Sequence, residues 1–258
     1  MSTNLATNSA SNSSGKSITQ AMILAAGKGT RLRPLTLTTP KPLVEVGGQP
    51  LIVWHIKALK AAGIDDIVIN TSWLSDKLMA ALGDGSQYGV KIHWSVEDGE
   101  PLETAGGIAK ALRDGHLKPS PFILINGDVW TDYDLLQLTD YVMTPDQQAH
   151  LLMINNPEHN ANGDFAINNG LASEQAVAEA QKYTFAGVSV ISPDLVQDIA
   201  QGQVAPLAPF LKQAMMKLQV TAEVMHAHWV DVGTAERLEQ INQKIASEGA
   251  GAHKASTD

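Results

Sequence analysis

Basic side chains and closely spaced glycines gather in LAAGKGTRLRPLTLTTPKPL, residues 24–43, directly after an apolar run. Gly27 and Gly29 carry no side chain, so backbone N–H groups there can approach an anion closely. Lys28 and Arg31 add positive charge, and a planar guanidinium can bind two phosphate oxygens at once. The pattern predicts a phosphate-binding loop at the end of a strand.

Lys41 lies between Pro40 and Pro42, which restrict its backbone. The loop matches neither of two familiar nucleotide motifs. The dinucleotide fingerprint G-x-G-x-x-G has Leu32 in place of its third glycine. In the P-loop G-x-x-x-x-G-K-[ST], a Ser or Thr follows the lysine, whereas Gly29 follows Lys28 here. A different kind of phosphate site is therefore expected.

Two carboxylates are candidates for a metal site. Asp128, in NGDVW, follows the apolar run PFILIN, and Asp231, in HWVDVGT, lies between two valines. A buried carboxylate is costly unless it is paired or binds a metal ion. A plain turn at Asp128 and a solvent-facing edge strand at Asp231 are the alternatives. Oxygen ligands suit Mg²⁺, which one or two carboxylates hold together with substrate phosphates.

The elements that must position these residues alternate between short apolar runs and helical patterns, which indicates an α/β fold. Expected strands are 21–26, 66–71, 90–96, 121–126, 149–155 and 183–191, and 220–232 is read as a further strand. Expected helices are 50–63, 75–82, 106–115, 134–142, 193–201 and 207–217, with a closing helix from 234. Ligands of a doubly wound sheet bind at the carboxyl ends of its strands, where the loop and Asp128 fall.

Composition narrows the class of protein. The chain has 258 residues, a formal charge of -9 and no cysteine. The acidic balance argues against nucleic-acid binding, and the missing cysteines exclude thiolate metal sites and cysteine nucleophiles. We find no signal peptide, no transmembrane segment and no evident protein partner, so we expect a cytoplasmic protein.

The expected domain organisation has one folded unit and two disordered ends. Residues 1–19 form a polar leader and 246–258 a polar tail. The single domain between them, 20–245, has a nucleotide-binding half (about 20–130) and a half (about 131–245) that the family resemblance described next implies to be sugar-binding.

The stretch LAAGKGTRLRPLTLTTPKPLVEVGGQPLI resembles the signature of the sugar-1-phosphate nucleotidyltransferases, G-x-G-T-R-L-x-P-L-T followed by P-K-P. The resemblance covers about residues 20–245. It implies a Rossmann-like, doubly wound, mixed but mainly parallel sheet with helices on both faces. It also implies the reaction of a nucleoside triphosphate with a sugar 1-phosphate to give a sugar nucleotide and pyrophosphate.

The same resemblance implies roles for individual residues. Catalysis falls to Arg31, Lys41, Asp128 and Asp231, and the two aspartates hold Mg²⁺. The segment VEDGEPLETAGGIAKAL, 96–112, resembles the part that reads the base, with Glu103 where glycine is commonest. The implied nucleotide site consists of Ala26, Gly27, Lys28, Gly29, Thr30, Arg31, Lys41, Glu97, Asp98, Gly106 and Gly107.

The sugar side is less complete. Asn126, Asp164 and Asp231 are the implied substrate-binding residues, although Asp164 also suits a plain turn. The Glu-Lys-Pro element of the family is missing between 170 and 183, which leaves Lys182 as a substitute for its lysine.

Several segments, among them GEPLETAGG and TFAGVSV, resemble the bacterial branch that transfers UMP from UTP to N-acetylmuramic acid 1-phosphate. Other acceptor and donor pairs are the alternative, namely glucose 1-phosphate with dTTP or UTP, or mannose 1-phosphate with GTP. A non-catalytic sugar-nucleotide sensor is a further alternative.

Overall fold

The computed structural model describes residues 18–176 and 181–254, with side chains up to 248. Most of the expected leader and the last residues of the expected tail, 1–17 and 255–258, lie outside the described residues. Within the described part, Ile18 is already buried in the core.

A nine-stranded mixed sheet runs through the molecule in the order β5-β4-β1-β6-β11-β8-β12-β10-β9. Its strands are β1 (Gln20–Leu24), β4 (Asp66–Thr71), β5 (Lys91–Val96), β6 (Phe122–Asn126), β8 (Ala149–Ile154), β9 (Phe165–Asn168), β10 (Leu171–Ser173), β11 (Lys182–Ile191) and β12 (Val220–Val224). Strands β5, β4, β1 and β6 are parallel, and β11 pairs antiparallel with both β6 and β8. The expected mixed α/β sheet is confirmed, and β8 and β12 form a further parallel pair within it.

Two small antiparallel pairs stand apart from this sheet, β2 (Glu45–Val46) with β3 (Gln49–Pro50), and β7 (Val129–Thr131) with β13 (Trp229–Asp231). The second pair joins the end of the nucleotide half to the C-terminal region. It places Asp231 opposite Val129, the residue after Asp128.

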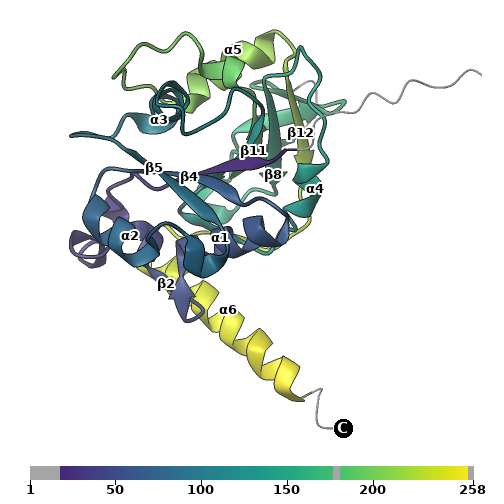
Figure 1. Cartoon of the computed structure of the whole chain (residues 1–258). Coiled ribbons are helices and arrows are strands. Elements are labelled where there is room, and N and C mark those ends of the chain that lie inside the picture. Colours follow the sequence, from purple (N-terminus) through teal and green to yellow (C-terminus); the bar gives the residue numbers. More distant parts are fainter. Residues whose placement is uncertain (1–17, 177–180, 255–258) are drawn as a thin grey trace, which may run out of the picture.

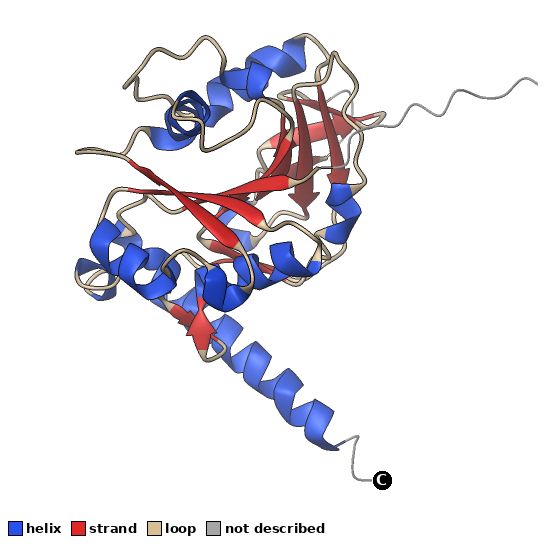
Figure 2. Cartoon of the chain, in the orientation of Figure 1, coloured by secondary structure: helices blue, strands red, loops and turns tan. Residues whose placement is uncertain are grey.

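Helices cover both faces of the sheet (Figures 1 and 2). The α-helices are α1 (Leu51–Ala61), α2 (Ser75–Leu82), α3 (Glu103–Arg113), α4 (Leu136–Thr139), α5 (Leu207–Met216) and α6 (Ala235–Lys254). Single 3-10 turns are η1 (Thr30–Leu32), η2 (Leu35–Leu37), η3 (Lys41–Leu43), η4 (Ser86–Tyr88), η5 (Glu158–Asn160) and η6 (Pro193–Val196).

Side chains of the buried strands point alternately to the two faces of the sheet, and this produces one hydrophobic cluster on each face. In β1, Ile23 packs with α1 and α2 in one hydrophobic cluster, whereas Met22 packs with α3 and α5 in the other. Successive side chains of a strand point to opposite faces, so a strand with apolar residues at every position is buried on both sides. A third, smaller cluster around Trp130 and Val232 packs against α6.

Three expectations about elements were wrong. The helix expected over 134–142 is only α4, and that over 193–201 is only the turn η6, which begins at Pro193. The single strand expected over 220–232 is two strands in different sheets, β12 and β13.

The C-terminal helix also differs from expectation. Helix α6 continues through 246–254, where a disordered tail was expected, because the Glu-, Lys- and Ala-rich stretch from 235 favours helix. Figure 1 shows its last turns extending away from the body of the molecule. None of the helices in the described part of the chain is both long and apolar enough to cross a membrane.

Candidate active site

A cleft of about 680 Å³ opens at the carboxyl ends of β1 and β6. Nine of the residues expected from the sequence line it: Ala26, Gly27, Lys28, Gly29, Thr30, Arg31, Lys41, Asn126 and Asp128. The phosphate-binding loop and the first carboxylate, about a hundred residues apart in sequence, thus face one another. The cleft lies where a doubly wound sheet presents its ligands.

The glycine loop is fixed by local packing. Gly29 has a φ of 60°, a conformation that favours glycine, and a Cβ there would lie 2.9 Å from Cγ2 of Thr36. The Thr36 hydroxyl donates a 2.7 Å hydrogen bond to the Gly29 carbonyl. Trp73 in turn donates from Nε1 to the Thr36 carbonyl at 3.0 Å, which ties this loop to the start of α2. Gly27 differs, since a Cβ there would meet no atom within 4 Å.

Each cation of the cleft is held by a carboxylate. Lys41 Nζ lies 2.8 Å from Asp128 Oδ2, and Lys28 Nζ lies 2.6 Å from Glu100 Oε2. Arg31 Nη1 lies 3.6 Å from Asp231 Oδ2. A polyanionic ligand must therefore compete with these carboxylates or bind together with a metal ion that occupies them.

Asp128 and Asp231 meet across the β7–β13 pair, where the Val232 N–H donates to the Asp128 carbonyl at 2.8 Å. Their side chains are 36% and 17% exposed. Asp231 lies outside the lining of the cleft, next to Arg31, which lines it. The structure therefore brings together the four residues expected to be catalytic.

The donor set fits a hard divalent cation. Asp231 Oδ1 is buried and has no hydrogen-bond partner among the described residues. An unpaired buried carboxylate oxygen is costly, and a cation would satisfy it. No group of three or more His, Asp or Glu side chains in the described residues has the geometry of a metal site. Further ligands would come from substrate phosphates and water, as is usual for Mg²⁺.

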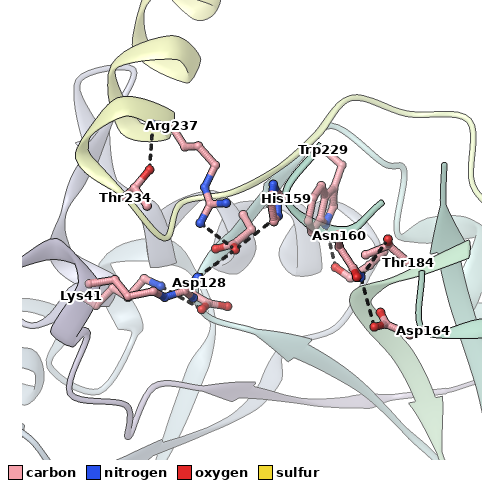
Figure 3. Close-up of polar contacts among 12 residues, drawn as sticks. Lys41, Asp128, His159, Asn160, Asp164, Thr184, Trp229, Thr234 and Arg237 are labelled. Atoms are coloured by element: carbon pink, nitrogen blue, oxygen red, sulfur yellow. Dashed lines mark hydrogen bonds and ion pairs between the residues drawn. The ribbon is translucent and has the colours of Figure 1, made fainter. Parts of the chain in front are cut away.

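Asp231 is also surrounded by residues that the sequence reasoning missed. Arg237 Nη2 lies 3.1 Å and His159 Nε2 3.8 Å from Asp231 Oδ2 (Figure 3). Arg237 stands six residues after Asp231, in the first turn of α6, whose start is marked by the Thr234 hydroxyl accepting from the Arg237 N–H at 3.3 Å. Thr234 is a sequence signal for the start of this helix, but no local pattern indicates that Arg237 contacts Asp231.

The base-reading segment is arranged differently from expectation. Glu97 is 3% exposed and accepts from Asn70 Nδ2 and from the Leu102 N–H, both at 2.7 Å. Asn70 accepts from the Ala25 N–H at 2.8 Å, so Glu97 supports the cleft wall from behind. Asp98 is exposed and does not line the cleft.

Gly106 and Gly107 lie in α3, buried, and not on the cleft. A Cβ on Gly107 would lie 2.7 Å from Glu97 Oε1, and one on Gly106 would lie 2.5 Å from the Gln203 carbonyl. The N–H groups expected to be free for a ligand are partly used, since Gly106 donates to the Ala205 carbonyl at 3.1 Å. These glycines allow close packing.

The Asp164 carboxylate forms hydrogen bonds within and next to its own turn. Its Oδ1 accepts from Asn160 Nδ2 at 3.1 Å, and its Oδ2 accepts from the Phe185 N–H at 2.8 Å (Figure 3). Asn160 also donates to Thr184 Oγ1 at 3.1 Å. In this arrangement both carboxylate oxygens hold the loop after η5 against β11.

A buried histidine lies beneath the site. Burial lowers the pKa of His55 to about 4, against the opposing effects of a hydrogen bond with the Val129 backbone and the charge of Asp128. His55 belongs to α1, so it links that helix to β7, which begins directly after Asp128. Its Nε2 has no partner among the described residues.

Comparison with known proteins agrees with this geometry. The model of the nucleotidyl transferase family matches residues 20–248. The chain belongs to the nucleotidyl transferase family. It is 46% identical over 223 residues to N-acetylmuramate alpha-1-phosphate uridylyltransferase of Neisseria meningitidis serogroup B, which covers 86% of this chain and 96% of that protein.

More distant relatives share the family and the fold. Mannose-1-phosphate guanylyltransferase of Mycobacterium tuberculosis is 30% identical over 226 residues, which cover 84% of this chain and 61% of that protein. The structure of HddC from Yersinia pseudotuberculosis complexed with GMP-PN matches with a TM-score of 0.70 and 22% identity, over 88% of this chain and 99% of that one. A UDP-glucose pyrophosphorylase complexed with UDP-glucose matches with a TM-score of 0.68 and 18% identity, over 90% and 99%. The latter two show the fold alone.

Proposed function

We propose that the protein transfers UMP from UTP to N-acetylmuramic acid 1-phosphate, giving UDP-N-acetylmuramate and pyrophosphate. The observation that carries this proposal is the 46% identity to a uridylyltransferase of that name across 96% of its length. The cleft supports the reaction class, because it joins a glycine-rich cationic loop to paired carboxylates.

The cations and glycines would hold the triphosphate. Gly27 and Gly29, the latter with a positive φ, leave backbone N–H groups open to the β- and γ-phosphates. Arg31 would add a bidentate contact to phosphate oxygens. Lys41, buried between the loop and Asp128, would contact the α-phosphate. Release of Lys41 from Asp128 supplies the positive charge where negative charge accumulates.

Asp128 and Asp231 would hold Mg²⁺, which when bound offsets charge on the α-phosphate. A phosphate oxygen of the acceptor attacks the α-phosphorus in line, and the bond from that phosphorus to the bridging oxygen of pyrophosphate breaks. No general base is needed, since a phosphate monoester is substantially ionised near neutral pH.

We place this reaction in the cytoplasm, in the reuse of cell-wall sugars. The placement follows from the sequence expectation and from the substrates of the proposed reaction, and it stays a proposal.

Pyrophosphate release tests the proposed function directly, with each of the four NTPs against a panel of sugar 1-phosphates and Mg²⁺. We expect turnover with UTP and N-acetylmuramic acid 1-phosphate to exceed every other pair. The relatives that are mannose-1-phosphate guanylyltransferases make GTP with mannose 1-phosphate the principal rival. Faster turnover of that pair would reject the proposed substrates and keep the family. Tight binding of a sugar nucleotide without any turnover would instead support a sensor.

The metal assignment has a separate test that does not depend on turnover. Mn²⁺ binding in the presence of UTP, followed by electron paramagnetic resonance, should weaken at least tenfold in Asp128→Asn and in Asp231→Asn. Unchanged Mn²⁺ affinity in either variant would remove that aspartate from the metal site.

A further inference from the structure

Asp231 Oδ2 is approached by two guanidinium groups and one imidazole. Arg237 lies at 3.1 Å, Arg31 at 3.6 Å and His159 at 3.8 Å. The two arginines carry one positive charge more than this carboxylate neutralises. The group therefore carries an excess of positive charge next to the cleft, which Arg31 lines.

Arg237 has hydrogen-bonding capacity to spare. Its side chain is 15% exposed, and its Nε has no hydrogen-bond partner among the described residues, whereas its Nη2 faces Asp231 Oδ2 at 3.1 Å in an ion pair that lacks the alignment of a hydrogen bond. A guanidinium carries five N–H donors, and a mostly buried one gains most from a second anionic acceptor. Both guanidinium groups pack against Gly233, where a Cβ would collide with Arg237 Nη2 and lie 2.9 Å from Arg31 Nη1.

Positively charged residues are rare in the sugar-binding half. Residues 131–245 contain Lys182, Lys212, Lys217, Arg237 and Lys244. Lys212 is paired with Glu174 at 2.6 Å, and Lys244 with Glu248 at 3.1 Å. Lys217 follows α5, which lies at the opposite end of the molecule from α6, the helix that carries Arg237 (Figure 1). Arg237 and Lys182 are the two cations of this half left to consider for an anionic acceptor.

His159 connects this cluster to the sugar side. It lies in η5, and the next residue, Asn160, holds Asp164 and Thr184 on the other side (Figure 3). An imidazole supplies a donor next to Arg237 without adding a second fixed charge. The loop from Pro157 thus brings a hydrogen-bonding group between Asp231 and β11.

We propose that Arg237, assisted by His159, determines acceptor specificity by binding the carboxylate of the acceptor sugar. The inference rests on the proposed function. N-acetylmuramic acid 1-phosphate differs from N-acetylglucosamine 1-phosphate by one ether-linked group that ends in a carboxylate. A cation that binds this carboxylate would therefore make the enzyme prefer the first sugar over the second. A guanidinium paired with a carboxylate is the side chain best suited to that task. Sites that bind one such group through charged contacts discriminate strongly against the analogue without it.

The test compares kcat/KM for the two sugar 1-phosphates with saturating UTP. In Arg237→Gln we expect the preference for N-acetylmuramic acid 1-phosphate over N-acetylglucosamine 1-phosphate to fall at least tenfold, and in His159→Gln severalfold. Any general damage to Asp231 lowers turnover of both sugars alike and leaves the ratio unchanged. Lys182→Gln is the matched control, and it should lower both rates together because both sugars carry the phosphate.

Each outcome decides the proposal. A ratio that stays at the wild-type value in both Arg237→Gln and His159→Gln overturns it, as does a ratio that collapses in Lys182→Gln alone. If Arg237→Gln does not fold, judged by circular dichroism, Arg237→Lys replaces it, and a preference reduced in that variant and in His159→Gln supports the proposal. Wild-type protein that turns over neither sugar contradicts the proposed function itself, which separates the two failures.

Discussion

Lys41 and Asp128 form a 2.8 Å ion pair across the candidate cleft, between a proline-restricted turn and the end of a buried strand. The lysine is buried, whereas the carboxylate is 36% exposed. A cation assigned to substrate phosphates and a carboxylate assigned to a metal ion thus neutralise one another in the free protein. Substrate and metal binding must exchange these partners, so each should strengthen the other.

Lys41→Met should therefore affect catalysis more than folding. We expect turnover to fall by about 10²- to 10³-fold, the usual loss for a donor that stabilises developing charge. Asp128 remains partly exposed and can be hydrated, so the free energy of unfolding should change by about 1 kcal/mol or less. Turnover by pyrophosphate release and unfolding by urea denaturation check this. Equal losses in both would make Lys41 structural.

Glu100→Gln should strengthen UTP binding. Lys28 and Glu100 both line the cleft, and their 2.6 Å ion pair occupies a cation of the phosphate loop. Removing the competing carboxylate should tighten the Kd for UTP by a factor of about 2 to 5, in line with an exposed ion pair. Lys28→Met should weaken UTP binding, and the double variant should resemble Lys28→Met. Calorimetry measures all three, and a weaker Kd in Glu100→Gln would show that Glu100 itself binds the ligand.

Gly27 and Gly107 should respond differently to alanine. At Gly27 the Cβ meets no atom within 4 Å, whereas at Gly107 it meets Glu97 Oε1 at 2.7 Å and Asn70 Nδ2 at 2.9 Å. Gly107→Ala should lower the free energy of unfolding by about 1–3 kcal/mol because the buried pair must shift. Gly27→Ala should leave stability unchanged and weaken UTP binding. Urea denaturation and calorimetry on both variants separate packing from ligand contact.

Glu103→Gly should stabilise the protein. Glu103 has a φ of 62°, in the left-handed region that costs an ordinary residue about 1–2 kcal/mol. Glycine relieves this cost but loses some of the gain through the entropy of the unfolded chain. The net effect should raise Tm by about 2–4 °C. Glu103→Ala keeps the strain and serves as the control, so an equal gain there would locate the benefit in the lost charge.

Acid should destabilise the fold through His55. Its folded-state pKa of about 4 lies below the ordinary value of 6.5, so the unfolded chain binds the proton first as pH falls. Neutral, buried His55 contributes in full to the free energy of unfolding above about pH 6.5. As the pH falls from 6.5 to 4, that free energy decreases by about 3 kcal/mol. Burial also lowers the pKa of His150, which adds to the slope.

His55→Gln tests the contribution of that residue. It should flatten the dependence of urea-unfolding free energy on pH between 6.5 and 4, whereas the exposed control His226→Gln should not. A slope unchanged in His55→Gln would assign the acid sensitivity to His150 and other groups.

The sequence by itself determined the loop, the lysine between prolines and the alternation of strands and helices. These features are local, since glycine, proline and hydrophobic periodicity act over a few residues. Element boundaries such as β4 over Asp66–Thr71 and α2 over Ser75–Leu82 agree with expectation for the same reason. Local sequence also singled out Asp128 and Asp231 as candidate carboxylates, and the family resemblance implied that the two share one metal site.

Only the tertiary structure decided what each polar side chain faces. Glu97 and Asp164 have the residue types of ligand contacts, yet hydrogen bonds from distant backbone and side-chain groups occupy both oxygens of each. Arg237 and His159 reach Asp231 because β13 leaves the main sheet to pair with β7, a choice between long-range partners that periodicity does not encode. Pairings between residues far apart in the chain depend on packing of the whole fold, and this is why the loop was readable from sequence whereas the surroundings of Asp231 were not.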